Sequence, residues 1–505
     1  MQKDITKSVN NRYIISIDQS TQGTKAFLLD GTGRMLLRRD KSHRQIISDE
    51  GWVSHDAEEI YRNTMALLGE LIRNSSVDPT QIAALAISNQ RETSVAWDHA
   101  TGESVGYAVV WQCRRAEGLC RELSACGNIV REKTGIPLSP YFPAAKFAWL
   151  LKNEPKVQEL LAQGRLCLGT IDSYLVFRLT GGHFLTDYSN ASRTQLFGLK
   201  TGNFDRELCD IFGIPMQCLP EIVDSDACFG ETDLGGLLPQ PIPIHAVMGD
   251  SHAALFGQGC LEKGMLKATY GTGSSIMMNV GETPVFSKNG LVSSVGFKVG
   301  GRLSYVLEGN LNYTGALITW LKKNLQLIEC DSEVEGLAME ANPEDMTCIV
   351  PAFTGLGAPY WDSEARAAIL GMTRITGKRE IARAALVSIA QQITDIVKVM
   401  EKDTSLRVTQ LRVDGGPTRN AYLMQMQSDL CGSRVLVPEA EELSGIGAAY
   451  AAGLAIGLYQ KSIFEKLKRK SYKNTMPEEM VEKYRSEWNW AIQKTLENGE
   501  RSETA

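Results

Sequence analysis

The sequence has no long apolar run, no paired-cysteine motif and no metal-binding pattern of histidines. Nowhere in its 505 residues is there an uninterrupted apolar run of 18, which argues against a membrane-spanning helix. Its eleven cysteines include no Cys-x-x-Cys pair, and its six histidines show no His-x-x-x-His spacing. An odd number of scattered cysteines is typical of reduced thiols in the cytoplasm rather than of disulfides or a zinc site.

Positive charge is not in excess either. Lys and Arg total 53 against 59 Asp and Glu, the formal net charge is −6, and the basic run "KLKRK" at 466–470 is short. We therefore expect no nucleic-acid partner and no membrane-surface role. Residues 1–11 are polar and contain no apolar core, so we expect no secretory signal, no membrane insertion and a cytoplasmic location.

Two common nucleotide-binding motifs are absent. The segment "GMTRITGK" (371–378) has five residues between its first Gly and Gly377, where a Walker A loop has four, and Arg379 replaces the Ser or Thr of that motif. The segment "GIGAAY" (445–450) ends in Tyr where a dinucleotide fingerprint requires Gly or Ala. By motif, the chain is neither a P-loop enzyme nor a Rossmann dehydrogenase.

What the sequence does contain is an alternation of strand-like and helix-like segments, which is typical of α/β proteins. The apolar runs at 82–88 and 242–250 predict buried strands, and the second run ends in an Asp. The apolar periodicity within 381–402 predicts a helix. The small residues of 444–457 predict a helix that another backbone can approach closely.

Residues 13–30 and 265–280 share one layout, in which a strand leads into a small polar loop and then into a second strand. This repetition predicts two domains of similar construction, 1–255 and 256–505, each contributing a loop to a shared cleft. A coincidence between two hairpins rich in Gly and Thr is the alternative interpretation.

Segments rich in Gly, Thr and Ser are candidate phosphate-binding loops, because backbone N–H groups and hydroxyls bind phosphate oxygens. There are four of them, at 18–25, 270–275, 355–362 and 414–420. Each alone is weak evidence, since most Gly-rich turns are only turns. Four in one acidic α/β chain favour nucleotide binding.

Two carboxylates, Asp18 and Asp250, each end an apolar strand in the predicted arrangement. Burial of an unpaired carboxylate is costly, so such a group usually meets a cation or transfers a proton. A cap on a turn is the ordinary alternative. For Asp18, which directly precedes a candidate phosphate loop, a magnesium-linked role is favoured.

A guanidinium and a carboxylate follow one of the buried strands, at Arg91 and Glu92. A salt bridge at the rim of the domain is the commoner fate of such a pair. Its donors and acceptors also match the neighbouring hydroxyls of a polyol, so the pair is a candidate substrate clamp. Trp111 offers an apolar wall of the kind that packs on the C–H face of a polyol.

Taken together, these segments resemble the FGGY family of carbohydrate kinases over essentially the whole chain. The matching segments are "DQSTQGTKA", "GWVSHD", "SNQRET", "VVWQCRR", "YFPAAKFAWLLKN", "DYSNASRTQLF", "YGTG", "PAFTGLGAPYWD", "LRVDGGPTRN" and "GAAYAAG". "NQRET" with "WQCRR" resembles the branch that phosphorylates glycerol rather than pentuloses. The resemblance implies two RNase H-like domains of the actin-like ATPase fold, as in hexokinase, Hsp70 and actin, with an interdomain cleft.

The resemblance also implies a role for individual residues. Asp250 matches the general base that accepts the proton of the terminal hydroxyl of glycerol as it attacks ATP, which gives glycerol 3-phosphate. The implied substrate-binding residues are Arg91, Glu92, Trp111, Tyr141, Asp250, Ser251 and Ser275. The implied nucleotide-binding residues are Thr21, Gln22, Gly23, Lys25, Gly271, Thr272, Gly315, Thr319, Gly416 and Asn420. Asp18 and Asp250 are the candidate carboxylates for Mg²⁺.

Two departures from the family pattern bear on the substrate. Ser251 stands where the family usually has a Gln that contacts glycerol, and Ser275 stands where a Phe usually lies against the glycerol carbons. The space they leave can hold water or a longer polyol, so erythritol, threitol, a pentitol or a pentulose is the alternative substrate.

A non-catalytic, actin-like nucleotide-binding protein is a further alternative. The intact Arg91, Glu92 and Asp250 argue against it, because a nucleotide sensor needs no polyol clamp. The family resemblance also implies a homodimer or a homotetramer.

Overall fold

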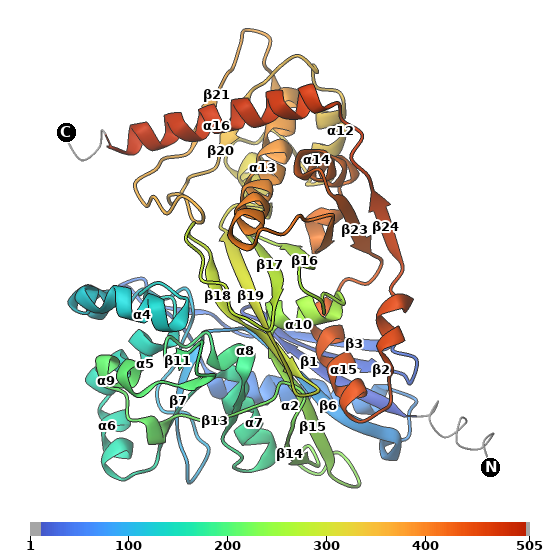
Figure 1. Ribbon diagram of the computed structural model, residues 1–505. Coiled ribbons are helices and arrows are strands. Elements are labelled where there is room, and N and C mark those ends of the chain that lie inside the picture. Colours follow the sequence, from blue (N-terminus) through green and yellow to red (C-terminus); the bar gives the residue numbers. More distant parts are fainter. Residues whose placement is uncertain (1–11, 501–505) are drawn as a thin grey trace.

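The computed structural model describes residues 12–500, so the polar segment 1–11, on which we based the absence of a secretory signal, lies outside the described residues. The chain forms two halves, one above the other in Figure 1, and each half is built around a β-sheet. All eleven cysteines are free. Between residues 12 and 500, none of the helices combines the length and the apolar character that crossing a lipid bilayer requires.

The N-terminal half contains a six-stranded sheet in the order β14-β15-β6-β1-β2-β3. The strands are β1 (Tyr13–Gln19), β2 (Gly23–Leu29), β3 (Met35–Ser42), β6 (Ile82–Asn89), β14 (Cys228–Thr232) and β15 (Ile242–Gly249). Strand β1 pairs antiparallel with β2 and parallel with β6, which pairs parallel with β15. Every residue of β6 is buried, as its apolar run predicts.

The C-terminal half contains a seven-stranded sheet in the order β18-β19-β17-β16-β22-β23-β24. The strands are β16 (Leu266–Tyr270), β17 (Ser274–Gly281), β18 (Val292–Val299), β19 (Arg302–Leu311), β22 (Gln410–Asp414), β23 (Arg434–Pro438) and β24 (Arg469–Tyr472). Strand β16 pairs antiparallel with β17 and parallel with β22, which pairs parallel with β23.

Strands β16, β17 and β22 thus take the places that β1, β2 and β6 have in the first sheet. The two β-turn-β segments are therefore equivalent parts of two similar domains, and their likeness is not a coincidence. This arrangement confirms the predicted pair of RNase H-like domains. The boundary near residue 255 stays a prediction.

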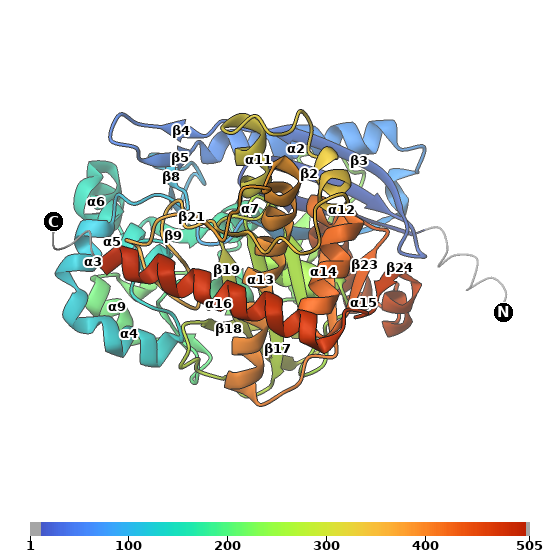
Figure 2. The ribbon, with the colours of Figure 1, turned by 90° about the horizontal axis from the view of Figure 1, so that it is seen from above.

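Helices cover the two sheets. Those of the N-terminal half are α2 (Ala57–Asn74), α3 (Glu117–Glu122), α4 (Gly127–Thr134), α5 (Pro143–Asn153), α6 (Pro155–Ala162), α7 (Ile171–Thr180), α8 (Tyr188–Ala191), α9 (Arg206–Phe212) and α10 (Asp250–Gly257). Those of the C-terminal half are α11 (Gly315–Lys323), α12 (Glu333–Met339), α13 (Lys378–Thr404), α14 (Ala421–Cys431), α15 (Leu443–Ala455) and α16 (Glu478–Glu500). Figure 2 shows α16 crossing the C-terminal half near α13 and α14.

Short strands complete the fold. A five-stranded sheet joins β4 (Ile46–Ile47), β5 (Val53–His55), β8 (Ala108–Val109), β7 (Ser94–Asp98) and β9 (Leu166–Thr170). Three strand pairs are β10 (Leu185–Asp187) with β13 (Glu221–Val223), β11 (Phe197–Gly198) with β12 (Asn203–Phe204), and β20 (Cys348–Val350) with β21 (Ala368–Leu370). Helix α13 confirms the helix predicted over 381–402, and its apolar stripe is buried in the core of the C-terminal half.

Helix α15 follows β23 in the sequence but lies against the sheet of the other half, beside β1 (Figure 1). There Ser16 Oγ donates to the Gly445 carbonyl oxygen at 2.7 Å. Helix α10 packs on α15 so closely that a Cβ added to Gly447 would lie 1.9 Å from the Ala253 carbonyl oxygen. The prediction that 444–457 forms a helix open to close approach by another backbone is confirmed.

We expect Gly447→Ala to lower the free energy of unfolding by about 1–3 kcal/mol, because the methyl group meets backbone atoms that cannot rotate away. Gly336→Ala in α12 is the matched control: the added Cβ meets no atom within 4 Å. This control should keep or slightly raise stability, since Ala favours a helix by about 1 kcal/mol over Gly. Urea denaturation of both variants measures the difference, and equal stabilities would contradict the close α10–α15 contact.

Candidate active site

The first carboxylate of the site, Asp18, lies one residue inside β1 rather than at its end. It is 6% exposed, and Ser88 Oγ donates to its Oδ1 at 3.0 Å. Burial raises the pKa of Asp18 to about 6; the positive charge of Lys25 opposes this shift, and the negative charge of Asp250 adds to it. The two predicted carboxylates therefore lie close enough to repel each other.

The second carboxylate, Asp250, is the first residue of α10 and follows directly after β15, which ends at Gly249. Arg91 Nε lies 3.3 Å from Asp250 Oδ1, and Ser251 N donates to the same oxygen at 2.6 Å. Burial raises the pKa of Asp250, while the Arg91 guanidinium opposes the shift. Its place just beyond the carboxyl end of β15 is where ligands bind in open α/β sheets.

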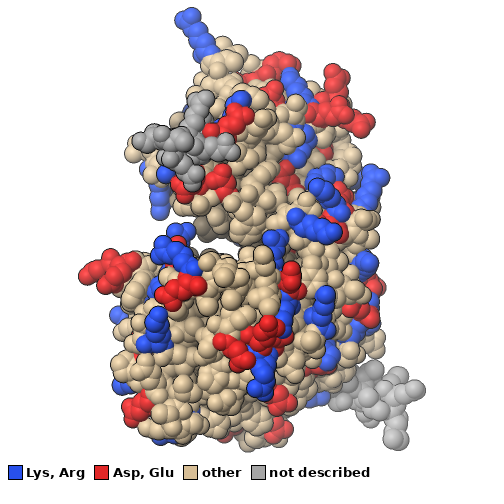
Figure 3. All heavy atoms as spheres, turned by 60° about the vertical axis from the view of Figure 1, so that its left-hand side comes forward, with Lys and Arg blue, Asp and Glu red and all other residues tan. Residues whose placement is uncertain are grey.

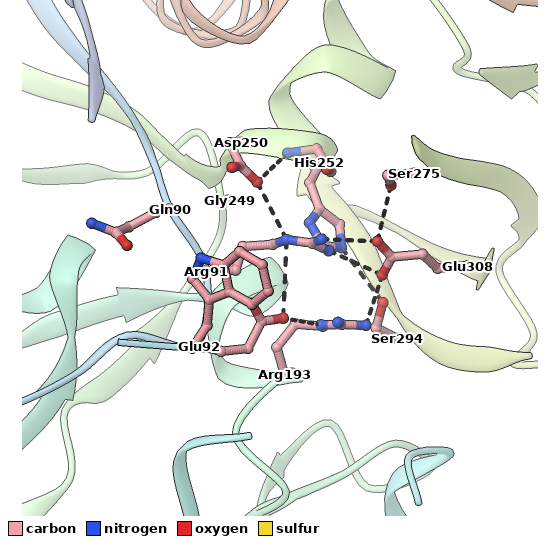
Figure 4. A network of polar contacts seen from close by, with 12 residues as sticks. Gln90, Arg91, Glu92, Arg193, Gly249, Asp250, His252, Ser275, Ser294 and Glu308 are labelled. Carbon is pink, nitrogen blue, oxygen red and sulfur yellow. Dashed lines mark hydrogen bonds and ion pairs between the residues drawn. The ribbon is translucent and has the colours of Figure 1, made fainter. Parts of the chain in front are cut away.

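The guanidinium of Arg91 is part of a closed ring of ion pairs (Figure 4). Arg91 donates two parallel hydrogen bonds to Glu308, at 3.0 Å from Nη1 and at 2.8 Å from Nη2. Arg193 donates to Glu92 at 2.6 Å and to Glu308 at 2.7 Å. We call the four residues Arg91, Glu92, Arg193 and Glu308 the charge ring.

The charge ring is almost fully buried, with exposed fractions of 7% for Arg91, 3% for Glu92, 1% for Arg193 and 0% for Glu308. Burial alone would raise the pKa of Glu308, but Arg193 and Arg91 hold it well below its ordinary value. Each charge therefore has a partner, which is the condition for burying ions at tolerable cost. The hypothesis of a rim salt bridge for Arg91 and Glu92 is wrong, because the pair lies in the interior.

Two members of the ring, Arg193 and Glu308, were not among the predicted site residues. Arg193 lies within the segment "DYSNASRTQLF", which resembles the family, but the resemblance implied no role for this arginine. Glu308 is a single carboxylate inside the apolar strand β19, and such an interruption is a signal of a buried charge with a partner. The partner itself is more than 100 residues away in sequence.

Aromatic side chains form one wall beside the charge ring. The rings of Trp111 and Tyr141 lie 5.4 Å apart, and Trp111 Nε1 donates to Thr21 Oγ1 at 2.9 Å. That bond links the predicted substrate wall to the predicted nucleotide turn. Glu92 adopts a left-handed φ of 61°, which a residue with a side chain rarely takes unless its surroundings fix it.

Ser251 and Ser275, the two small residues of the predicted substrate set, are half-buried and lie near the charge ring. Ser275 Oγ donates to Glu308 Oε1 at 3.0 Å. The backbone N–H of Ser251 donates a hydrogen bond to Asp250 Oδ1. The structure thus joins Ser251, Ser275, Arg91, Glu92 and Asp250 through direct contacts or shared partners.

A cavity of about 620 Å³ in the C-terminal half is lined by six predicted nucleotide-binding residues. These are Gly271, Thr272, Gly315, Thr319, Gly416 and Asn420. Gly315 N donates to the Gly271 carbonyl oxygen at 2.9 Å, and a Cβ on Gly315 would lie 2.7 Å from that oxygen. Only glycine therefore lets α11 begin against this turn.

The other four predicted nucleotide-binding residues are in the β1–β2 hairpin of the opposite half. Thr21 and Gln22 form its turn, and Lys25 Nζ is paired with Glu442 Oε2 at 2.7 Å. Figure 3 shows that the surface is hollowed between the two halves. Of the four predicted loops, 355–362 lies elsewhere: it lines a separate cavity with Gln392, Asp395 and Trp488.

Comparison with known proteins gives consistent matches over both halves. Residues 13–257 match the N-terminal domain of the FGGY family of carbohydrate kinases, and residues 266–456 match its C-terminal domain. Glycerol kinase 1 of Thermotoga maritima is 46% identical over 490 residues, which cover 96% of this chain and 99% of that protein.

Solved structures agree with this result. A crystal structure of Plasmodium falciparum glycerol kinase with ADP has a TM-score of 0.91 and 36% sequence identity, covering 96% of this chain and 98% of that one. Gluconate kinase from Lactobacillus acidophilus has a TM-score of 0.87 at 22% identity, covering 97% and 98% of the two chains, and shows the shared fold alone.

Proposed function

Because the chain belongs to the FGGY family of carbohydrate kinases, we propose that it transfers the γ-phosphoryl group of ATP to the terminal hydroxyl of glycerol, giving glycerol 3-phosphate. The observation that carries the proposal is the position of Asp250. Its carboxylate lies 3.3 Å from the buried Arg91 guanidinium, next to Glu92 and beside the aromatic wall. The site therefore offers a proton acceptor together with donors and acceptors for a small polyol.

In this proposal Asp250 accepts the proton of the attacking hydroxyl. Arg91 keeps the Asp250 carboxylate ionised and binds hydroxyl oxygens, while Glu92 accepts hydrogen bonds from the polyol. Tyr141 and Trp111 pack on its carbon atoms. Phosphoryl transfer depends mainly on in-line positioning and on neutralisation of charge, so this small set of groups is sufficient.

The nucleotide part of the proposal rests on the cavity in the C-terminal half. Its volume of about 620 Å³ is within the range of small-molecule sites. Backbone N–H groups near Gly271 and Gly416 are suited to phosphate oxygens. Thr21, Gln22, Gly23 and Lys25 approach the phosphates from the opposite half, and closure of the two halves would exclude water.

The site also fits a magnesium ion that enters together with ATP. Among the residues that the structure describes, no group of three His, Cys, Asp or Glu side chains is placed to hold a metal by itself. Mg²⁺ is commonly held by one or two carboxylates together with substrate phosphates, and the buried Asp18 and the nearby Asp250 match that donor set. When bound, the ion neutralises charge on the transferred group.

An ADP-release assay over a panel of polyols tests the substrate. We expect glycerol to give the highest kcat/KM, with erythritol, threitol, ribitol and xylulose about tenfold or more lower, since each added carbon must displace ordered groups of the clamp. The reaction product, identified as glycerol 3-phosphate by mass spectrometry, is the second readout.

A longer polyol or ketose is the second candidate substrate, and one observation favours it. Ser251 and Ser275 are small, half-buried side chains beside the charge ring, where larger ones would fill space. If any member of the panel exceeded glycerol in kcat/KM, the glycerol assignment would fail and the kinase assignment would stand. No release of ADP with any polyol would contradict both.

We also propose that the protein acts in the cytoplasm as a homodimer or homotetramer. Its eleven free cysteines, seven of them buried, suit a reducing compartment. Light scattering after size-exclusion chromatography measures the oligomeric state, and a monomer at assay concentration would contradict that part.

A further inference from the structure

One member of the charge ring comes from the opposite half of the molecule. Arg91, Glu92 and Arg193 belong to the N-terminal half, whereas Glu308 lies on β19 of the C-terminal sheet (Figure 4). Glu308 accepts both parallel hydrogen bonds of Arg91 and one hydrogen bond of Arg193. Glu308 therefore binds the C-terminal sheet to the two arginines of the charge ring.

Strand β19 connects Glu308 to the proposed nucleotide cavity. It pairs with β17, where Met277 is opposite Glu308 and Ser275 is opposite Asn310. Strand β17 begins at Ser274, directly after the turn that holds Gly271 and Thr272 in the nucleotide cavity. The hydrogen bond from Ser275 Oγ to Glu308 Oε1 joins β17 to β19 through side chains as well.

We propose that Glu308 is a positioning residue that keeps the polyol clamp of one half in register with the phosphate-binding turn of the other. The inference rests on the proposed kinase function. A two-point bond between rigid strands and a planar guanidinium fixes direction as well as distance. The alcohol oxygen held by the clamp is thereby aligned with the phosphorus atom held by the turn, and small errors in such alignment cost large factors in rate.

Glu308 also determines which nitrogen atoms of Arg91 are available to Asp250. Both terminal nitrogens of Arg91 are bound to Glu308, and its Nε lies 3.3 Å from Asp250 Oδ1. Other charged or titratable groups near Glu308 are Arg193, His252 and Lys267. Loss of the Glu308 charge would free the terminal nitrogens of Arg91 to form a paired contact with Asp250, which would occupy the oxygens that the substrate needs.

Glu308→Gln tests the inference, because it keeps the length of the side chain and removes the charge. We expect kcat at saturating glycerol and ATP to fall by about 100-fold, while the Kd of ATP without glycerol stays within about threefold of the original chain. Calorimetric titration with ATP and steady-state kinetics give the two values. Substitution of a residue that only stabilised the fold would not lower kcat while leaving the Kd of ATP unchanged.

Two further variants keep the test decisive. Glu308→Asp keeps the charge but shortens the reach, so we expect a folded protein with kcat lowered by about tenfold, and it decides the question if Glu308→Gln does not fold. Asp345→Asn is the matched control: Asp345 is a 5% exposed carboxylate in the C-terminal half that pairs with Arg383, outside the charge ring. Its kcat should be unchanged even if its melting temperature falls.

The inference is overturned if kcat of the folded Glu308 variants stays within about threefold of the original chain, or if the affinity for ATP falls as far as kcat does. Failure of the proposed function looks different. In that case the original chain itself would phosphorylate no polyol in the panel, whatever residue is at position 308.

Discussion

Asp250→Asn is expected to lower kcat by about 10³-fold, because asparagine cannot accept the proton of the attacking hydroxyl. The substitution keeps the shape of the side chain and one oxygen that can accept the hydrogen bond of Ser251 N and remain close to Arg91 Nε. Substrate binding should therefore change much less than turnover, with KM for glycerol within about tenfold. Steady-state kinetics over both substrates measure this separation.

Asp172→Asn is a suitable control for this prediction. Asp172 is fully buried in the same half, and burial raises its pKa to about 6, yet it is bonded to Thr170 and Thr186 rather than to the charge ring. Its kcat should match that of the original chain. If Asp250→Asn retained full phosphoryl transfer, our assignment of the base would be wrong, although the assignment of the family would not change.

Much of the fold follows from local patterns in the sequence. The apolar runs that became β6 and β15 and the helical periodicity of α13 depend on neighbours in the chain, so a linear reading finds them. The repeated hairpin at 13–30 and 265–280 further predicted two similar domains. The strand ends were placed one residue wrongly, since β1 continues past Asp18 and β15 stops before Asp250.

The chemistry of the site was less accessible, because its partners are far apart in sequence. Arg91 and Glu308 are 217 residues apart, and no spacing rule connects residues across two domains. Gly271 and Gly416 lie in loops whose composition predicted a phosphate site, whereas Gly315, which lines the same cavity, was implied only by the family resemblance. The loop 355–362 has the same composition but lines a different cavity, so Gly-rich composition alone does not identify a site.

The buried carboxylate of Asp18 lowers the stability of the ligand-free protein at any pH at which it is ionised. Asp18 is held in a place where burial and a neighbouring negative charge raise its pKa to about 6. An ordinary aspartate in an unfolded chain has a pKa of about 3.9, so folding costs free energy whenever Asp18 is ionised. The same buried negative charge, which Lys25 and Ser88 offset only in part, would attract a magnesium ion arriving with ATP.

Asp18→Asn is therefore expected to raise stability while abolishing most of the activity. Since the folded pKa lies above the unfolded one, the wild-type penalty is absent below about pH 4, grows between about pH 4 and 6, and is fully present above that range. The difference of about two pKa units corresponds to at most about 3 kcal/mol. We expect the variant to gain about 1–3 kcal/mol near pH 8, and less as the pH falls below about 6.

Ser88→Ala gives a control of opposite sign. The Ser88 hydroxyl donates to Asp18 Oδ1 at 3.0 Å and favours the ionised form, so its removal should raise the pKa of Asp18 further and lower stability at neutral pH. Urea denaturation of the three proteins at several pH values, without nucleotide or magnesium, measures both effects. A stability gain of Asp18→Asn that does not shrink toward acid pH would show that the gain comes from packing, and that the ionised carboxylate of Asp18 costs the fold nothing.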